Sequence, residues 1–573
     1  MQRWYRRWFP GSASQRAPVV RQAQVPRGPS NLAIAIAVNA ALFSLTFLLV
    51  TLTYETNDDV VMMMYASGLL GGQPSEYLVF INILIGKLLA LLYWHAPGVN
   101  WYTVFFLASH FTAMVALAYA FLSRGRRLVS LLFFILLFAF FEVRLLARLQ
   151  FTTTACVLLM SGFLLFATSP RTPGRRPWAL FVLAAILVTA GGLVRMRAFY
   201  LVMLLAAPLL VARFLETKST RIPVFLTAAC VLFFAGRLCD RRAYAHDPRW
   251  ASYGEYNDVR SRIHGQPLEG DLEAAYEQVG WSRNDAAMFF GWFFADERVY
   301  SKEKLEAIAA LRGPRSTHEA ASLLWRIARK RDVRVFVGLT LLAVGGAVLL
   351  ASRKTRLLVL GTAVEALLVV VYLAYASRVP ARVYMPMLFF LSSVSMIRLA
   401  QDRTWVRVPF PRAVRWASIL LVAACCGLGF RHSRRNEKVL AAREMHDQLL
   451  ATISPRGSEV FVLWEFPYEC ISPFTTFEQY RKHGFRFLPV GWMLHSPHDQ
   501  KLRSEFGMRD VFASLYERTN VFVVSCSPGC AEILRQYIRE HHHQEVRLQI
   551  RCRIGDPGSR GEYVCYKVER AAR

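Results

Sequence analysis

The sequence predicts a polytopic α-helical membrane protein with a small soluble α/β domain at its C-terminal end. Hydrophobic residues make up 54% of the 573 positions and charged residues only 19%, whereas about a quarter of a soluble domain is charged. Long apolar runs recur along the chain, and residues 431–573 alternate strand-like and helical patterns. An aromatic content of 13% argues against disorder.

The apolar runs have the lengths of membrane spans. A bilayer core about 30 Å thick takes about 20 apolar residues in a helix. Eleven runs meet or approach this length, and the shorter ones are expected to extend into their flanks. They are residues 31–53, 101–122, 128–141, 151–168, 178–194, 198–215, 222–239, 334–351, 357–376, 383–399 and 416–430.

Charge decides how a further apolar run, residues 77–95, is placed. Cytoplasmic loops carry an excess of Lys and Arg, and the first 30 residues hold six Arg and no acid, so the N-terminus is expected inside. Five later basic connections also fall inside only if 77–95 does not cross. We therefore expect 77–95 to be a helix in the plane of the outer membrane–water boundary.

This topology accounts for most of the net charge of +29, which is made up of 69 basic and 40 acidic residues. Nucleic acid is consequently not expected as a partner, whereas membrane lipid is. The expected location is the cell (inner) membrane, with a cytoplasmic N-terminus and a periplasmic or extracellular tail.

The predicted domains follow from the spans. They are a basic cytoplasmic segment 1–30, a transmembrane core 31–239 with a first outer loop 54–100, an outer helical insert 240–333, further spans over 334–430, and an outer α/β domain 431–573. In this last domain, strands are expected at 460–464, 520–525, 546–552 and 563–568, and a helix at 531–541.

Five of the ten cysteines lie in the tail: Cys470, Cys526, Cys530, Cys552 and Cys565. An exported domain can form disulfides, so the pairs Cys526–Cys530 and Cys552–Cys565 and free thiols both remain open. A zinc site with the nearby histidines 541–543 fits less well, because the ligand spacing is wrong.

An acidic motif, Asn57-Asp58-Asp59, follows directly on the first span at the outer surface. Adjacent carboxylates repel each other beside a membrane, so one of them can serve as a general base. Alternatively, Asp58 and Asp59 hold a divalent cation, Mg or Mn. The simpler interpretation is a helix cap, because Asn and Asp favour the start of a helix.

Several arginines lie outside, against the usual topological bias. They are Arg144 and Arg148, Arg195 and Arg197, and Arg378 and Arg382, with Tyr384 close by. Arginine beside hydrocarbon is costly and usually has a partner, and guanidinium pairs suit phosphate. Lipid headgroups, or ion pairs with Glu142 or Asp58, are the alternatives. The chain has no phosphate-binding loop of the Walker type, zinc-protease motif or serine-hydrolase motif.

The order of these features resembles the GT-C class of membrane glycosyltransferases, which includes protein O-mannosyltransferases, aminoarabinose transferases and oligosaccharyltransferases. In that class an acidic motif follows the first span, and an in-plane helix precedes the second. Here Asn57-Asp58-Asp59 matches the acidic motif and 77–95 the in-plane helix, whereas Pro74-Ser75-Glu76-Tyr77-Leu78 matches the usual His-Pro-Pro-Leu only loosely.

The resemblance implies an enzyme that transfers a sugar from a polyprenyl-phosphate donor to a lipid, glycan or protein acceptor. Asp58 would be the base, with Asp59 as the second carboxylate or a metal ligand. The donor phosphate would be bound by Arg195, Arg197, Arg378 and Arg382. Weaker substrate-binding candidates are Asn57, Glu76, Arg144, Arg148 and Tyr384.

Other function classes stay open on the sequence. A polysaccharide polymerase or ligase would also have many spans and outer arginines, but typically without an early aspartate pair. A transporter would need more charge within its spans, and a non-catalytic envelope-assembly protein would not need Asp58.

Overall fold

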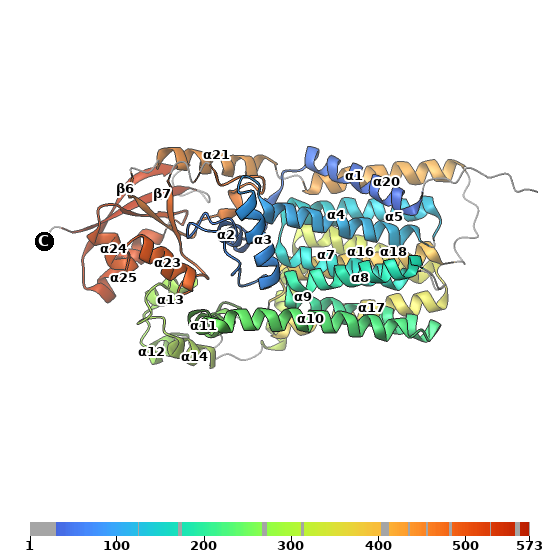
Figure 1. Cartoon of the computed structure of the whole chain (residues 1–573), viewed down its shortest axis with the longest axis horizontal. Helices are drawn as coiled ribbons and strands as arrows, with labels where there is room; N and C mark the ends of the chain where they lie inside the picture. Colours follow the sequence, from blue (N-terminus) through green and yellow to red (C-terminus); the bar gives the residue numbers. More distant parts are fainter. Residues whose placement is uncertain are drawn as a thin grey trace, which may run out of the picture.

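The protein is a long helical bundle with the α/β tail and the insert packed at one end (Figure 1). The computed structural model describes residues 30–571 except 124, 170–174, 266–271, 311–314, 377, 403–411, 434–435, 454–456, 479, 481–483, 528 and 556–561. Apart from Ser30, the expected cytoplasmic segment 1–30 therefore lies outside the described residues.

Ten of the eleven predicted runs are confirmed as helices long and apolar enough to cross a membrane. They are α1 (Asn31–Leu49), α4 (Trp101–Leu122), the continuous stretch α5–η2–α6 (Arg127–Leu137, Phe138–Glu142, Val143–Ala147), α7 (Phe151–Thr168), α8 (Arg175–Val194), α9 (Met196–Thr217), α10 (Arg221–His246), α16 (Arg331–Leu350), α17 (Arg353–Ala376) and α18 (Ala381–Gln401).

The eleventh run, 416–430, lies in α20 (Arg412–Ser433), which packs against α5 and the π-helical turn η2. Its apolar part, Ser418–Arg431, is shorter than a span and runs partly over residues whose side chains are not described. The described chain therefore has ten such helices rather than the expected eleven.

The helix expected over 77–95 forms only in its second part, as α3 (Ile83–His95). Asn82 caps it, accepting a hydrogen bond from the Leu84 N–H at 3.0 Å, and Asp240 accepts from the Ile83 N–H at 2.8 Å. These caps end the non-helical segment 77–82, which bends at Val79 with φ 66°, so the predicted helical start was wrong. With 13 residues α3 is too short to span, and it lies across the end of the bundle (Figure 1).

Hydrogen bonds gather several basic connections at the bundle end opposite the tail. Asn31 Nδ2 donates to Leu122 O at 2.9 Å, and Ser352 Oγ donates to Asp402 Oδ2 at 2.6 Å. At the tail end, β1 (Thr53–Tyr54) pairs in parallel with β2 (Arg148–Leu149). The first two contacts put the start of α1 beside the end of α4 and the α16–α17 connection beside the end of α18, as the charge pattern predicts.

This arrangement gives a direct labelling prediction. A single cysteine at Arg126, in a variant lacking the native cysteines, should react with a membrane-impermeant reagent only after the inner face is exposed. A cysteine at the exposed, tail-domain residue Glu517 should react without that treatment. Labelling of position 126 from outside would mean that the predicted inside and outside assignments are reversed for every connection after the first span.

The tail folds around a five-stranded mixed sheet in the order β4-β3-β5-β7-β6. The strands are β3 (Val460–Trp464), β4 (Arg486–Pro489), β5 (Val521–Ser525), β6 (Val546–Ile554) and β7 (Tyr563–Arg570), and the helices are α21 (Asn436–Thr452), η3 (Tyr468–Cys470), α23 (Pro497–Glu505), α24 (Val511–Glu517) and α25 (Cys530–His542). The four predicted strands and the predicted helix are confirmed, whereas β4 was not anticipated.

The cysteines are free thiols. Cys552 and Cys565 face each other across the ladder of β6 and β7, and the Cys526 thiol donates to Glu465 O at 2.7 Å. Of the two alternatives left open by the sequence, the structure therefore has thiols rather than disulfides.

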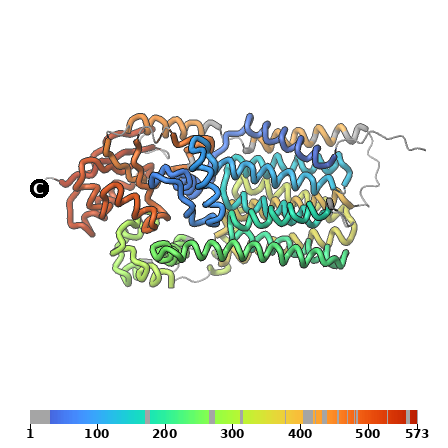
Figure 2. Tube along the Cα trace, viewed as in Figure 1, coloured from blue at the N-terminus to red at the C-terminus, as the bar shows by residue number. Residues whose placement is uncertain are grey.

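The insert lies beside the tail (Figure 2). Its helices are α11 (Pro248–Gly265), α12 (Leu272–Gln278), α13 (Arg283–Phe290), α14 (Lys302–Ala310) and α15 (Thr317–Arg329). The predicted boundary at 240 falls inside α10, which runs on to His246, and α16 begins at Arg331. The insert contacts the tail at two places: α13 packs against α25, and α11 packs against α23.

The tail also binds the first outer loop and the residues that flank it. Asn57 Nδ2 donates to Phe466 O at 3.1 Å, and Thr103 Oγ1 donates to Pro473 O at 2.7 Å. Arg443 of α21 donates from Nη2 to Leu52 O at 2.6 Å. The segment that carries the acidic motif is thereby held between the bundle and the tail.

Candidate functional site

The acidic motif opens helix α2 (Asn57–Ala66). Thr56 takes the N-cap position with an extended backbone, and Asp58 and Asp59 lie in the first turn. Neither carboxylate caps the helix, so capping does not explain the pair. A negative charge here is favoured by the helix dipole.

Asp59 is a buried anchor. Its Oδ1 accepts from the Tyr102 hydroxyl and from the Phe151 N–H, both at 3.0 Å, and its Oδ2 accepts from the Thr56 hydroxyl at 3.1 Å. Burial and the neighbouring Asp58 raise the pKa of Asp59 well above its usual value. Asp59 therefore ties α2 to α4 and α7 and has little capacity left for a substrate.

Asp58 has a different environment. Its side chain is partly exposed, and no hydrogen bond to it is recorded from the described residues. Burial raises the pKa of Asp58, while the positive charges of Arg382, Arg195 and Arg260 lower it, and burial prevails. An ionisable carboxylate with free acceptor capacity and a raised pKa suits a general base.

Arg195 is held next to this carboxylate by two aromatic rings. It precedes α9, and its guanidinium lies 5.3 Å from the ring of Phe80 and 5.1 Å from that of Phe151. Burial lowers the pKa of Arg195 to about 10, so it remains charged at neutral pH. Phe151 thus orients Arg195 through its ring and Asp59 through its backbone.

The other outer arginines are not equivalent. Arg382, at the start of α18, acts electrostatically on both Asp58 and Glu55. Arg378 is exposed and acts on Arg382 and Arg260. Arg197 is exposed, and its positive charge helps burial to lower the pKa of Arg195. Asp58 thus feels the charges of Arg195, at the N-cap of α9, and of Arg382, in the first turn of α18, with Arg260 as a third.

A cavity of about 400 Å³ lies beside this site. Its polar lining consists of Glu55, Arg144, Arg148, Thr153, Lys330, Arg331, Asp332 and Tyr384. The carboxylate of Asp332 lies 3.8 Å from the Arg144 guanidinium. Burial raises the pKa of Glu55, while Arg144 and Arg148 lower it. Arg144, Arg148 and Tyr384 therefore share this second, mainly cationic space.

A larger apolar groove of about 1290 Å³ adjoins the cavity between α5, α16, α18 and α20. It is lined mostly by Leu, Val and Phe side chains and shares Arg331 and Asp332 with the smaller cavity. An amphiphile with an anionic head and a long apolar chain matches this combination.

Two weaker candidates are placed elsewhere. Asn57 donates its amide to Phe466 of the tail and so fixes the domain. The main-chain carbonyl oxygen of Glu76 packs against Gly86 of α3. A Cβ at position 86 would lie 2.0 Å from that oxygen, so this position requires glycine. Burial, and after it the charge of the Glu76 carboxylate, raises the pKa of Tyr77.

Sequence reasoning missed Arg260, Lys330 and Arg331. Lys330 and Arg331 were assigned to the end of the outer insert 240–333 and were not considered as site residues. Arg260 lies on the face of α11 that carries Tyr253 and His264, and the aromatic residues at helical spacing were the available signal.

The aspartate pair does not fit a divalent cation. The oxygens of Asp59 already accept O–H and N–H donors, and Asp58 is faced by guanidinium groups. Among the described residues, one group of three metal-binding side chains has its ligand atoms within 4.8 Å, and it lies between insert and tail: Asp285, Glu540 and His541.

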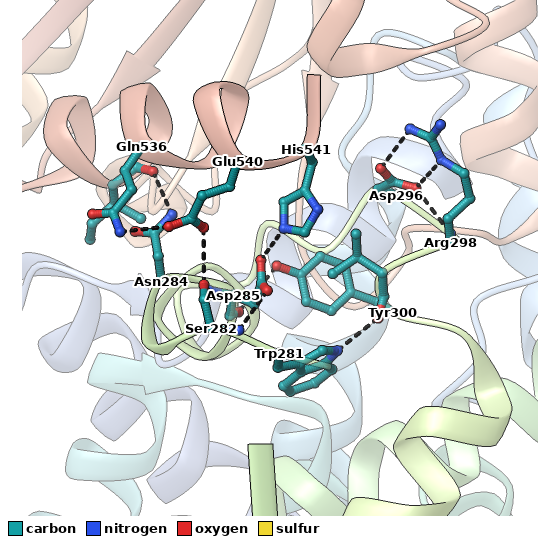
Figure 3. A network of polar contacts seen from close by, with 12 residues as sticks. Trp281, Ser282, Asn284, Asp285, Asp296, Arg298, Tyr300, Gln536, Glu540 and His541 are labelled. Atoms are coloured by element: carbon teal, nitrogen blue, oxygen red, sulfur yellow. Dashed lines mark hydrogen bonds and ion pairs between the residues drawn. The ribbon is translucent and has the colours of Figure 1, made fainter. Parts of the chain in front are cut away.

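These three side chains already form a hydrogen-bonded network (Figure 3). His541 Nε2 donates to Asp285 Oδ1 at 2.6 Å, and the Ser282 hydroxyl donates to Glu540 Oε2 at 3.0 Å. Asp285 is buried and also accepts from the Ser282 N–H within a capping box. The network joins α13 to α25.

This contact should make insert–tail docking pH-dependent. The hydrogen bond to Asp285 raises the pKa of His541. The stabilisation is therefore complete below about pH 6.5 and is lost as pH rises through the folded-state pKa. His541→Gln should reduce hydrogen-exchange protection of α13 and α25 by about 1.5 kcal/mol at pH 6 and by less at pH 9.

The control is His543→Asn, since His543 is exposed and has φ 50°, which Asn tolerates. Equal loss of protection at both pH values in the His541 variant would contradict a charged pair.

Comparisons with known proteins give limited similarity. No protein-family model matches the chain, and no curated protein matches it. Among solved structures, it is similar to ArnT from Cupriavidus metallidurans in the apo state, at 11% identity and a TM-score of 0.42. ArnT bound to undecaprenyl phosphate gives 10% identity and a TM-score of 0.41. Each alignment covers 93% of this chain and 97% of the ArnT chain.

Proposed function

We propose that the protein is an integral-membrane glycosyltransferase that moves a sugar from a polyprenyl-phosphate donor to a hydroxyl of a lipid, glycan or protein acceptor. The observation that carries the proposal is Asp58, a carboxylate with a raised pKa beside Arg195 and Arg382. We also propose, from the distribution of basic residues among the connections, that it lies in the cell (inner) membrane with the N-terminus cytoplasmic and the tail outside.

The chemistry is a direct displacement at the anomeric carbon. Asp58 takes the proton of the acceptor hydroxyl as its oxygen forms the new glycosidic bond. The bond between the anomeric carbon and the phosphate oxygen breaks, and the phosphate leaves with the bonding electrons. Arg195 and Arg382 stabilise the charge that develops on it. No step is assigned to a metal, because the donor set around Asp58 favours anions.

The lipid part of the donor has a matching surface. The apolar groove between α5, α16, α18 and α20 would take the polyprenyl chain, and it shares Arg331 and Asp332 with the cationic cavity that Glu55 and Tyr384 also line. Undecaprenyl phosphate, the lipid bound in the second ArnT structure, is accordingly the probe of choice.

The test is a transfer assay with the purified protein in nanodiscs. A polyprenyl-phosphate donor carrying a labelled sugar should release free polyprenyl phosphate and yield a labelled product with a membrane-lipid or glycan extract. Failure to bind undecaprenyl phosphate at all would rule out the proposal.

A further inference from the structure

The last helix of the insert, α15, starts on the end of one span and leads directly into another. The Arg315 guanidinium donates from Nη1 to Ala374 O at 2.8 Å. The Thr317 and Tyr375 hydroxyls lie 3.4 Å apart, so the start of α15 is fixed at the end of α17. Lys330 alone separates α15 from α16. Because α16 and α17 are both long and apolar enough to cross a membrane, α15 lies where these helices leave the bilayer.

One face of α15 is packed against the bundle. Ala320 is buried there, and Leu323, Leu324 and Ile327 complete an apolar stripe at helical spacing. The stripe belongs to one apolar cluster with Ala374 and its neighbours at the end of α17. The bundle therefore accounts for this stripe but not for the residues on the opposite face.

The opposite face carries a tryptophan and two arginines. Trp325 is 63% exposed, and the Arg329 guanidinium lies 5.4 Å from the centre of its ring. Arg326 and Arg329 are both exposed, and no carboxylate within the described residues forms an ion pair with either. The helix dipole favours cations in the last turn, but it gives no reason for a large exposed aromatic ring beside them.

The headgroup layer of a bilayer suits this combination. A tryptophan there has apolar surroundings for its ring and polar ones for its N–H, and a guanidinium pairs with phosphate. Amphipathic helices with a basic face bind anionic lipids in this way. We propose that the Trp325 face of α15, which consists of Trp325, Arg326 and Arg329, docks onto anionic phospholipid headgroups in the leaflet at the tail end of the bundle.

This face is separate from the proposed donor site. The cationic cavity is lined by Lys330 and Arg331, and neither that cavity nor the apolar groove is lined by a residue of the Trp325 face. The inference therefore does not rest on the proposed transferase activity. It requires only that the helices of the bundle lie in a membrane.

The test measures which lipid surrounds the helix. A fluorescent dye is attached through Ala321→Cys, in a full-length variant lacking the native cysteines, because Ala321 is exposed one turn before Trp325. The protein is placed in nanodiscs of phosphatidylcholine and phosphatidylglycerol. In paired samples, equal amounts of one lipid or the other carry bromine near the glycerol backbone and quench the dye at short range. The ratio of the two quenching efficiencies reports the local enrichment of the anionic lipid.

The informative variants are Arg326→Gln/Arg329→Gln and Trp325→Ser. The matched control is Arg249→Gln/Arg262→Gln, which removes the same charge from two exposed arginines elsewhere in the insert. Phospholipid retained by the purified chain with its native cysteines gives a second measurement, which does not depend on the cysteine replacements.

In the parent, brominated phosphatidylglycerol should quench more strongly than brominated phosphatidylcholine, and added salt should reduce the difference. The arginine double variant should lose about fivefold of this preference per arginine and should retain less phosphatidylglycerol on purification. Trp325→Ser should lower quenching by both lipids, whereas the control variant should match the parent.

Equal quenching by the two lipids in the parent would overturn the proposal, and so would an unchanged ratio in the arginine double variant. Absence of quenching by either lipid would also overturn it, because the Trp325 face would then lie in water, open to a soluble partner. None of these results bears on sugar transfer, so the proposed function is tested separately.

Discussion

Asp58→Asn is expected to lower sugar transfer by about 10²–10⁴-fold, the usual contribution of a general base, while the protein stays folded. The described residues make no recorded hydrogen bond to Asp58, so the amide disturbs little. Because burial raises the pKa of Asp58, transfer by the parent should fall as pH drops through that pKa. The measurement is initial transfer rate against pH, with expression and elution profile as checks.

Asp59 provides the matched comparison one residue away. Asp59→Ala leaves the Tyr102 hydroxyl and the Phe151 N–H without their buried acceptor, which costs about 1–3 kcal/mol per group. This variant should lose thermal stability, whereas Asp58→Asn should not. Parent-level transfer by Asp58→Asn would instead favour a non-catalytic envelope-assembly protein.

Arg195→Ala is expected to reduce kcat/KM for the donor by about 10–150-fold, corresponding to about 1.5–3 kcal/mol for a charge-assisted hydrogen bond. Arg195→Lys should recover only part of the loss, because an ammonium lacks the planar contact with Phe80 and Phe151. Donor binding and single-turnover transfer measure the effect.

Arg197→Ala is the control, since Arg197 is exposed two residues further on. It should leave donor use unchanged. Equal losses in the Arg195 and Arg197 variants would indicate a general effect of positive charge at the membrane surface rather than a phosphate site.

The sequence predicted the features that depend on local patterns. Hydropathy located ten helices, and alternation located four strands of the tail. The non-helical segment before Ile83 was missed because its end is set by Asn82 and by Asp240, which lies far along the chain. Strand β4 was missed because its four residues, Arg486–Pro489, are too few to show alternation.

The sequence predicted which kinds of residue form the site, but it did not predict the separate roles of the two aspartates. Asp58 and Asp59 are adjacent and chemically identical, and only the donors on Tyr102 and Phe151 make one an anchor. Those donors lie 43 and 92 residues away in the chain. Arg260 could not be recognised either, because its proximity to Asp58 depends on how α11 packs against Trp492.

The bond from Asn57 to Phe466 has a consequence for biosynthesis. The two residues are 409 positions apart, and a ribosome adding about 5–20 residues per second needs about 20–80 s to make the intervening chain. During that interval the nascent protein already displays its carboxylate but lacks the surface that fixes it. For the proposed transferase, transfer is expected to begin only after translocation of the tail, and a prematurely terminated chain is expected to remain inactive in the membrane.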